Sequence, residues 1–156
     1  IQLSVAAAVA TSVLTKASGS DDDEDYTADR YVPFLRSPLV TRLEHLKITE
    51  QSGNASDWFA VIQKHVPQNA KPIITVGAST IKRAPKGGYT DLTLEFEGKY
   101  LWSFLDRYES FDPSGFTRIE FRQIGPLETA KKDLVDRYRA LVKRCSGHAE
   151  TTLTEV

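Results

Sequence analysis

The sequence contains one cysteine, Cys145, and no methionine among its 156 residues. A single cysteine excludes an intramolecular disulfide and a cysteine-based metal site. A disulfide-stapled secreted domain is therefore excluded, and a reducing compartment fits. No apolar run approaches the roughly 18–20 residues of a transmembrane helix, so we expect no membrane span. Because methionine is absent, we expect the initiator to have been removed or to lie upstream of Ile1.

Residues suited to catalysis are also scarce. The three histidines, His45, His65 and His148, stand at no spacing typical of metal ligands. Ser79 and Ser114 lack the context of a nucleophile elbow. We therefore predict no metal site, no cofactor and no catalytic residue, and we expect that the protein is not an enzyme.

Charge is unevenly distributed along a chain whose formal net charge is −1. Residues 1–30 carry six acidic side chains against two basic ones, whereas residues 118–144 carry eight basic against four acidic. Such asymmetry bears on partners and solubility rather than on fold. It permits RNA binding without proving it.

The chain divides by composition into three parts. Residues 1–30 form an N-terminal extension, in which 1–18 favour a short helix and Asp21–Asp25 a solvated acidic linker. Residues 1–20 lack acidic side chains and are rich in Ala, Ser and Thr, which partly fits a transit peptide, although an ordinary extension fits as well. We expect a single domain over 31–144 and a frayed C-terminal tail over 145–156.

Hydrophobic periodicity predicts alternating strands and helices in the domain. The order is strand, helix, strand, long loop, strand, helix, strand and helix, over residues 42–49, 56–66, 72–76, 77–89, 91–97, 100–108, 117–124 and 127–143. We therefore predict an α+β fold with a mostly antiparallel sheet covered by helices. Helical spacing assigns four aromatic residues to the core rather than to base stacking: Trp58, Trp102, Phe104 and Tyr108.

The predicted loop at 77–90 is the first candidate binding site. Lys82, Arg83 and Lys86 would contact phosphates, and Gly87 and Gly88 would let the backbone approach RNA closely. Lys71, just before the strand, adds a further candidate contact, and Tyr89 is expected to be exposed beside the glycines. The alternative is an ordinary solvated hairpin loop without a ligand.

The last predicted helix is the second candidate. Lys131, Lys132 and Arg139 lie on its surface among further basic residues, and we expect them to contact RNA. The alternative is an ordinary charged helix face, since Asp133 and Asp136 partly offset the basic charge.

Residues 71–108 carry a pattern that resembles the large-subunit ribosomal protein L five family. The pattern is a KPxIT strand, a basic glycine-containing loop, an alternating strand that closes at a glycine, and a WEFxxR-type helix. Here it is represented by KPIIT at 71–75, the basic loop at 82–88, the strand ending at Gly98 and WSFLDR at 102–107. RLEHLKIT and DWFAVIQKHVPQNA occupy the places of the family's first strand and helix, which extends the match over 41–108.

The resemblance implies a structural component of the large ribosomal subunit that braces ribosomal RNA in the central protuberance. Its partners would be large-subunit rRNA, 5S rRNA where the ribosome contains it, and neighbouring ribosomal proteins. The short segment 109–116 leaves no room for the family's arm towards tRNA, so the chain is more similar to a reduced mitochondrial version, located in the matrix. The alternative function is a protein-interaction subunit of another large assembly without RNA contact.

Overall fold

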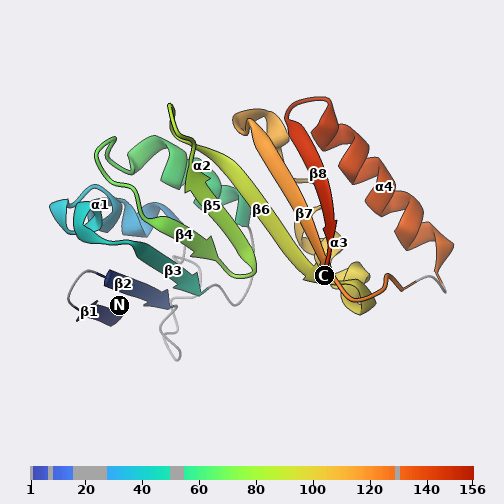
Figure 1. Cartoon of the computed structure of the whole chain (residues 1–156), viewed down its shortest axis with the longest axis horizontal. Helices are drawn as coiled ribbons and strands as arrows, with labels where there is room; N and C mark the ends of the chain where they lie inside the picture. Colours follow the sequence, from blue (N-terminus) through green and yellow to red (C-terminus); the bar gives the residue numbers. More distant parts are fainter. Residues whose placement is uncertain (1, 7–8, 16–27, 50–54, 129–130) are drawn as a thin grey trace. The chain divides into compact units, whose positions relative to one another are not determined.

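A computed structural model describes residues 2–6, 9–15, 28–49, 55–128 and 131–156. The chain forms two compact units, Ile1–Tyr89 and Thr90–Val156. Each unit combines strands with helices, so the predicted α+β class is confirmed (Figure 1).

The first unit holds a sheet in the order β1-β2-β3-β4-β5. Its strands are β1 (Gln2–Ala6), β2 (Val9–Thr15), β3 (His45–Thr49), β4 (Ile73–Val76) and β5 (Ser79–Arg83). Its helices are α1 (Val32–Leu35) and α2 (Ala55–His65), with short 3-10 turns at Ala28–Tyr31 and Pro38–Arg42. Among its buried side chains are Leu46, Ile48, Ile62, Ile74 and Ile81.

The second unit holds three strands and two longer helices. In chain order they are β6 (Tyr89–Glu97), α3 (Leu101–Tyr108), β7 (Arg118–Ile124), α4 (Lys132–Ser146) and β8 (Glu150–Glu155). Aromatic rings fill its core. The Phe96 and Phe104 rings stack with their centroids 4.2 Å apart, and the ring centroids of Tyr138 and Phe121 lie 5.9 Å apart.

Strand pairing is mixed, and the predicted mostly antiparallel sheet is wrong. The β1–β2 and β4–β5 pairs are antiparallel, whereas β2–β3, β3–β4, β6–β7 and β7–β8 are parallel. A parallel pair needs a crossover connection, which a helix commonly provides. Along the chain, α2 comes between β3 and β4, α3 between β6 and β7, and α4 between β7 and β8.

The N-terminal extension also differs from the prediction. Strands β1 and β2 form where a short helix over 1–18 was expected. Valine and threonine are frequent in this stretch, and their β-branched side chains favour strands. The acidic linker Asp21–Asp25 lies outside the described residues.

Two further segments are more regular than predicted. The long loop over 77–89 is instead the hairpin strand β5 with short turns, because Ile74 pairs with Ile81 and Val76 with Ser79. The C-terminal tail over 145–156 is instead the end of α4 and the strand β8, which pairs with β7 from Arg118 to Gln123.

Candidate functional site

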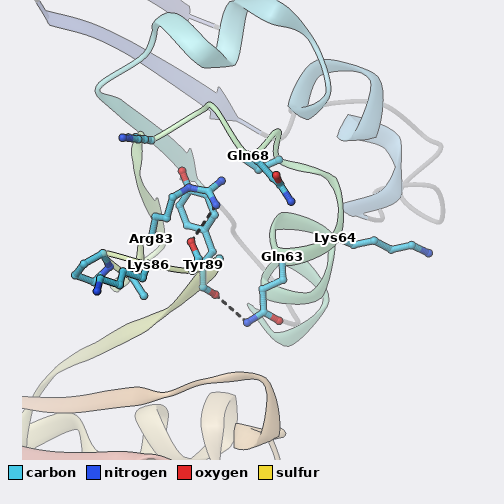
Figure 2. Close-up of a pocket in the computed structure, with 12 residues that line it drawn as sticks. Gln63, Lys64, Gln68, Arg83, Lys86 and Tyr89 are labelled. Carbon is cyan, nitrogen blue, oxygen red and sulfur yellow. Dashed lines mark hydrogen bonds between the residues drawn. The ribbon is translucent and has the colours of Figure 1, made fainter.

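A basic hollow of about 570 Å³ lies in the first unit (Figure 2). Four of the described residues that line it are cationic and none is acidic: Lys64, Lys71, Arg83 and Lys86. Two side-chain amides, Gln63 and Gln68, add neutral hydrogen-bonding groups. An uncompensated cluster of cations raises the local concentration of anions, so this hollow is suited to negatively charged ligands.

Helix α2 and the segment after it form one wall of the hollow. The helix buries Phe59 and Ile62, which directs Gln63 and Lys64 towards solvent. The helix ends before Pro67, which cannot donate a backbone hydrogen bond. The amide of Ala70 then donates to the Pro67 carbonyl at 3.0 Å, and this turn leads the chain to Lys71.

The turn between β5 and β6 forms the other wall. The Ala84 amide donates to the Gly88 carbonyl at 2.9 Å, and the Gly87 amide donates to the Ala84 carbonyl at 3.2 Å. Lys86, Gly87 and Gly88 are exposed at the tip of this turn. The backbone at Gly88 is open, since a Cβ atom added there would meet nothing within 4 Å.

Arg83 holds the two walls together. Its Nε donates to the Ala70 carbonyl at 2.9 Å, one terminal nitrogen to the Pro67 carbonyl at 2.9 Å, and the other to the Gly87 carbonyl at 3.2 Å. A guanidinium has five N–H groups, and these three bonds together with the interaction with the Tyr89 side chain use most of them. Arg83 therefore has a structural role, and its contact with phosphate stays a prediction.

Tyr89 forms the floor of the site and is buried, so the predicted exposed aromatic is wrong. Its hydroxyl donates to the Pro72 carbonyl at 2.8 Å, and its carbonyl accepts from Gln63 Nε2 at 2.9 Å. The Arg83 guanidinium lies 4.6 Å from the ring centroid. Burial raises the pKa of Tyr89 to about 12, and the nearby Arg83 opposes that rise.

Three lysines of the hollow remain exposed: Lys64, Lys71 and Lys86. Within the described part of the chain, none of their ammonium groups has an ion-pair partner. The fold thus brings together five of the predicted residues: Lys71, Arg83, Lys86, Gly87 and Gly88. Lys82 is exposed on β5 and does not line the hollow.

The sequence-based prediction missed Gln63, Lys64 and Gln68. These residues precede the basic turn by about twenty positions and lie on or after a helix interpreted as core packing. The signal in the sequence that could have identified these residues is the polar, basic face of α2. This helix comes just before Lys71 and the strand that follows it.

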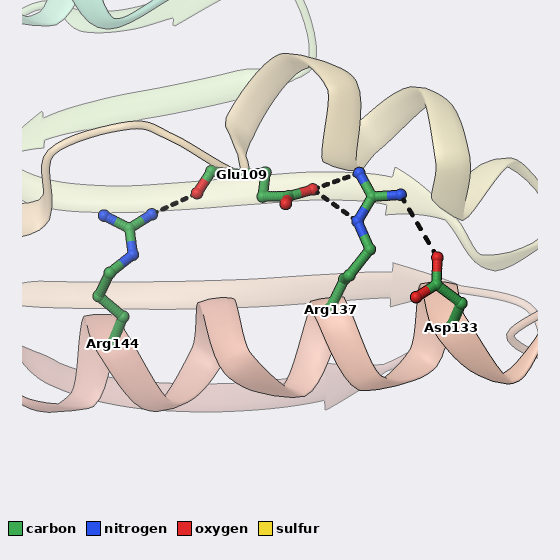
Figure 3. Close-up of polar contacts among 4 residues, drawn as sticks. All are labelled: Glu109, Asp133, Arg137 and Arg144. Atoms are coloured by element: carbon green, nitrogen blue, oxygen red, sulfur yellow. Dashed lines mark hydrogen bonds and ion pairs between the residues drawn. The ribbon is translucent and has the colours of Figure 1, made fainter.

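The second predicted set, Lys131, Lys132 and Arg139, is exposed at the start and on the surface of α4, in the second unit. Other basic residues of this helix have structural partners (Figure 3). The Arg137 guanidinium donates from Nε to Glu109 Oε2 at 2.9 Å and pairs with Asp133 at 3.9 Å. The Arg144 guanidinium donates to the Glu109 and Phe111 carbonyls.

The described residues offer neither a reactive thiol nor a cluster of metal ligands. Cys145 is fully buried, and burial raises the pKa of its thiol to about 11, which disfavours the reactive thiolate. Among the described residues, no three of the His, Cys, Asp and Glu side chains are placed to hold a metal ion. No helix in the same residues has the length and hydrophobicity to cross a bilayer.

Comparison with known proteins adds no family to these observations. The chain matches no protein-family model, no curated protein and no solved structure.

Proposed function

We propose that this protein binds the phosphate backbone of RNA through the basic hollow of its first unit. The observation that carries the proposal is the lining of that hollow: four cations, two amides and no described carboxylate. Lysine and arginine side chains and backbone amides are the groups that most often contact phosphates. The exposed turn at 84–88 adds backbone that a bulky ligand can approach.

The mechanism is electrostatic and steric. The strands and helix α2 hold the hollow in shape, while Lys64, Lys71 and Lys86 supply charge that no described carboxylate in the lining offsets. Binding releases counterions from the RNA, so affinity should fall steeply as salt rises. Such contacts fix position and orientation without reading base sequence.

The resemblance of residues 71–108 supports a more specific role. We propose that the protein is a structural component of the large subunit of a mitochondrial ribosome and braces rRNA in the central protuberance. Neighbouring ribosomal proteins would be its further partners, with 5S rRNA where that ribosome contains it.

A second candidate function is a protein-interaction subunit without RNA contact. The observation that favours it is the internal use of several cations, because Arg83, Arg137 and Arg144 donate to groups of the protein itself. The two functions differ in whether the remaining lysines matter for binding RNA.

A matched pair of triple variants separates these functions. One variant carries Lys64→Gln, Lys71→Gln and Lys86→Gln, and the other carries Lys131→Gln, Lys132→Gln and Arg139→Gln. Each loses three positive charges, so the net charge of the whole chain changes equally. Affinity for a structured fragment of large-subunit rRNA is measured across a salt series.

We expect the hollow variant to lose affinity and its salt slope to fall by about two to three, because each lost phosphate contact contributes roughly 0.7–0.9. Equal loss in both variants would contradict the hollow as the main site, because either the α4 surface contributes equally or net charge alone controls binding. An unmodified protein without salt-dependent affinity would reject the RNA proposal and favour the second function.

Sedimentation of the native protein from a gentle lysate tests the ribosomal role separately. Co-migration with the large subunit that is lost after RNase treatment is the expected result. If the protein binds RNA in isolation but migrates away from ribosomes, the hollow stands and the ribosomal role fails.

A further inference from the structure

Strand β8 leaves one of its edges without a partner. In the described part of the chain, β8 pairs with β7 alone, along residues 150–155 (Figure 1). An unpaired edge presents N–H and C=O groups that can receive another strand. Natural proteins often protect such edges with lysine, proline or a bulge. The β8 sequence, ETTLTE, contains neither lysine nor proline, and its charged side chains, Glu150 and Glu155, stand only at its two ends.

The backbone bonds show which groups the free edge offers. The Glu150 amide donates to the Thr117 carbonyl at 3.0 Å, and the Val156 amide donates to the Gln123 carbonyl at 2.9 Å. Alternate residues of a strand point their backbone groups to opposite edges. The even-numbered residues of β8 therefore face β7, and the outward groups belong to Thr151, Leu153 and Glu155.

The middle of this edge is apolar and accessible. Leu153 pairs with the buried Phe121 of β7, yet its side chain is 61% exposed. Directly paired residues lie on the same face of a sheet. A strand added at the free edge would therefore place its own side chain beside Leu153 on the face that buries Phe121.

We propose that the free chain forms a two-fold dimer in which β8 pairs antiparallel with β8 of a second copy, centred on Leu153. In that register the outward-facing residues oppose one another: Leu153 lies opposite Leu153, and Thr151 lies opposite Glu155. The remaining pairs are Thr152 with Thr154 and Glu150 with Val156. No like charges are opposed, which favours this partner, since like charges directly opposite destabilise a pair of strands.

The other two-fold centres on the same edge fit less well. Centres at Thr152 and Thr154 would hold the two Leu153 side chains apart, opposite Thr151 and Glu155 respectively. A centre at Thr151 would place Leu153 opposite Ala149, and a centre at Glu155 would oppose two carboxylates. The interface centred on Leu153 is isologous and closes on itself, so it forms a dimer rather than a fibre. One strand pair buries less than the roughly 1,200 Å² of small specific interfaces, so the dimer should dissociate on dilution.

Sedimentation equilibrium of the nuclease-treated full chain over a concentration series tests the proposal. Leu153→Lys and Leu153→Glu each place like charges across the two-fold axis, so we expect at least tenfold weaker dimerisation. An equimolar mixture of the two variants places opposite charges there, and we expect it to recover the dimer. Thr152→Lys is the control, because residue 152 lies opposite Thr154 rather than itself.

Circular dichroism checks that each variant keeps its fold, which we expect because residue 153 is exposed. A wild-type chain that stays monomeric at all concentrations would overturn the proposal. A dimer that Leu153→Lys leaves intact, or variants that fail to combine, would place the interface elsewhere. In this experiment nuclease treatment removes nucleic acid, and the β8 variants leave the basic hollow unchanged. The dimer proposal can therefore fail or succeed independently of RNA binding.

Discussion

The guanidinium of Arg83 joins three segments of backbone, around Pro67, Ala70 and Gly87. Its neighbour Lys82 is exposed and does not line the basic hollow. In the sequence the two residues look equivalent, because both are cations beside a glycine pair. Only the register of β5 separates them, since successive side chains of a strand point to opposite faces.

Replacing Arg83 should therefore destabilise the fold rather than merely remove a ligand contact. We expect Arg83→Lys to lower the free energy of unfolding by about 1–3 kcal/mol, because one ammonium cannot replace the planar fork and partly buried carbonyls lose their donors. Lys82→Gln is the matched control and should stay within about 0.5 kcal/mol of wild type. Urea unfolding measures both, and equal effects would contradict the structural role of Arg83.

Two aromatic residues show where residue-level prediction fails. Trp102 follows the helical spacing of core residues yet is 53% exposed, whereas Tyr89 was expected to be exposed and is buried. The helix α3 turns only one face to the core, and Trp102 lies just outside that face. The fate of Tyr89 depends on the Pro72 carbonyl, which is distant in sequence and therefore not visible in a local pattern.

At the scale of elements, the end of β6 passes very close to the segment after β7. A Cβ atom added at Gly98 would lie 2.3 Å from the Pro126 carbonyl oxygen and 2.8 Å from that of Gly125. The Glu128 amide also donates to the Gly98 carbonyl at 3.0 Å. Glycine is needed at position 98 because two backbone segments meet there.

Gly98→Ala should consequently force the two segments apart. We expect it to destabilise the protein by at least about 1–3 kcal/mol, as other overpacking substitutions do. Gly88→Ala makes the same chemical change where a Cβ atom would meet nothing within 4 Å, so it serves as the control. Thermal unfolding of both variants checks the prediction, which fails if their melting temperatures coincide.

The order of elements from β3 to α4 was predictable apart from β5, but the direction of pairing was not. Leu92, Leu94 and Phe96 alternate with polar residues and are buried as expected. The same alternation fits a parallel or an antiparallel neighbour. What decides the direction is the helical crossover between β6 and β7 and between β7 and β8. The first crossover was predicted as strand, helix and strand, whereas the second was missed because β8 was predicted as a frayed tail.

At the scale of the whole molecule, two buried tyrosines make the free energy of unfolding depend on pH in the alkaline range. Burial raises the pKa of Tyr89 and that of Tyr138 to about 12, from an ordinary value of 10. The folded state therefore holds these protons more tightly than the unfolded chain. The stabilisation is fully present below pH 10 and is lost as the pH rises towards 12.

We expect the free energy of unfolding to decline from about pH 10 upward. Tyr138→Phe should reduce this decline, because phenylalanine cannot ionise, while neutral stability changes little. Denaturant titrations at successive pH values measure the effect. Ultraviolet absorbance of the phenolates gives an independent reading, and a Tyr138→Phe protein that loses stability with the same slope would contradict the assignment.

The basic hollow also depends on several elements of the first unit rather than on one local motif. Its residues come from α2, from the segment after it and from the β5–β6 turn. The sequence showed the charges of the turn but not that Lys64 would join them, because the turn at 67–70 and the Arg83 bonds decide that arrangement. Lys131, Lys132 and Arg139 remain a separate candidate surface, in the second unit.

The division into two units leaves each of them with one natural tryptophan. Trp58 is buried in the first unit, and Trp102 is half-exposed in the second. In a Trp102→Phe protein, tryptophan emission reports the first unit alone, whereas circular dichroism still reports both. Coincident unfolding curves would then identify a single cooperative body, and separate curves two thermodynamic domains.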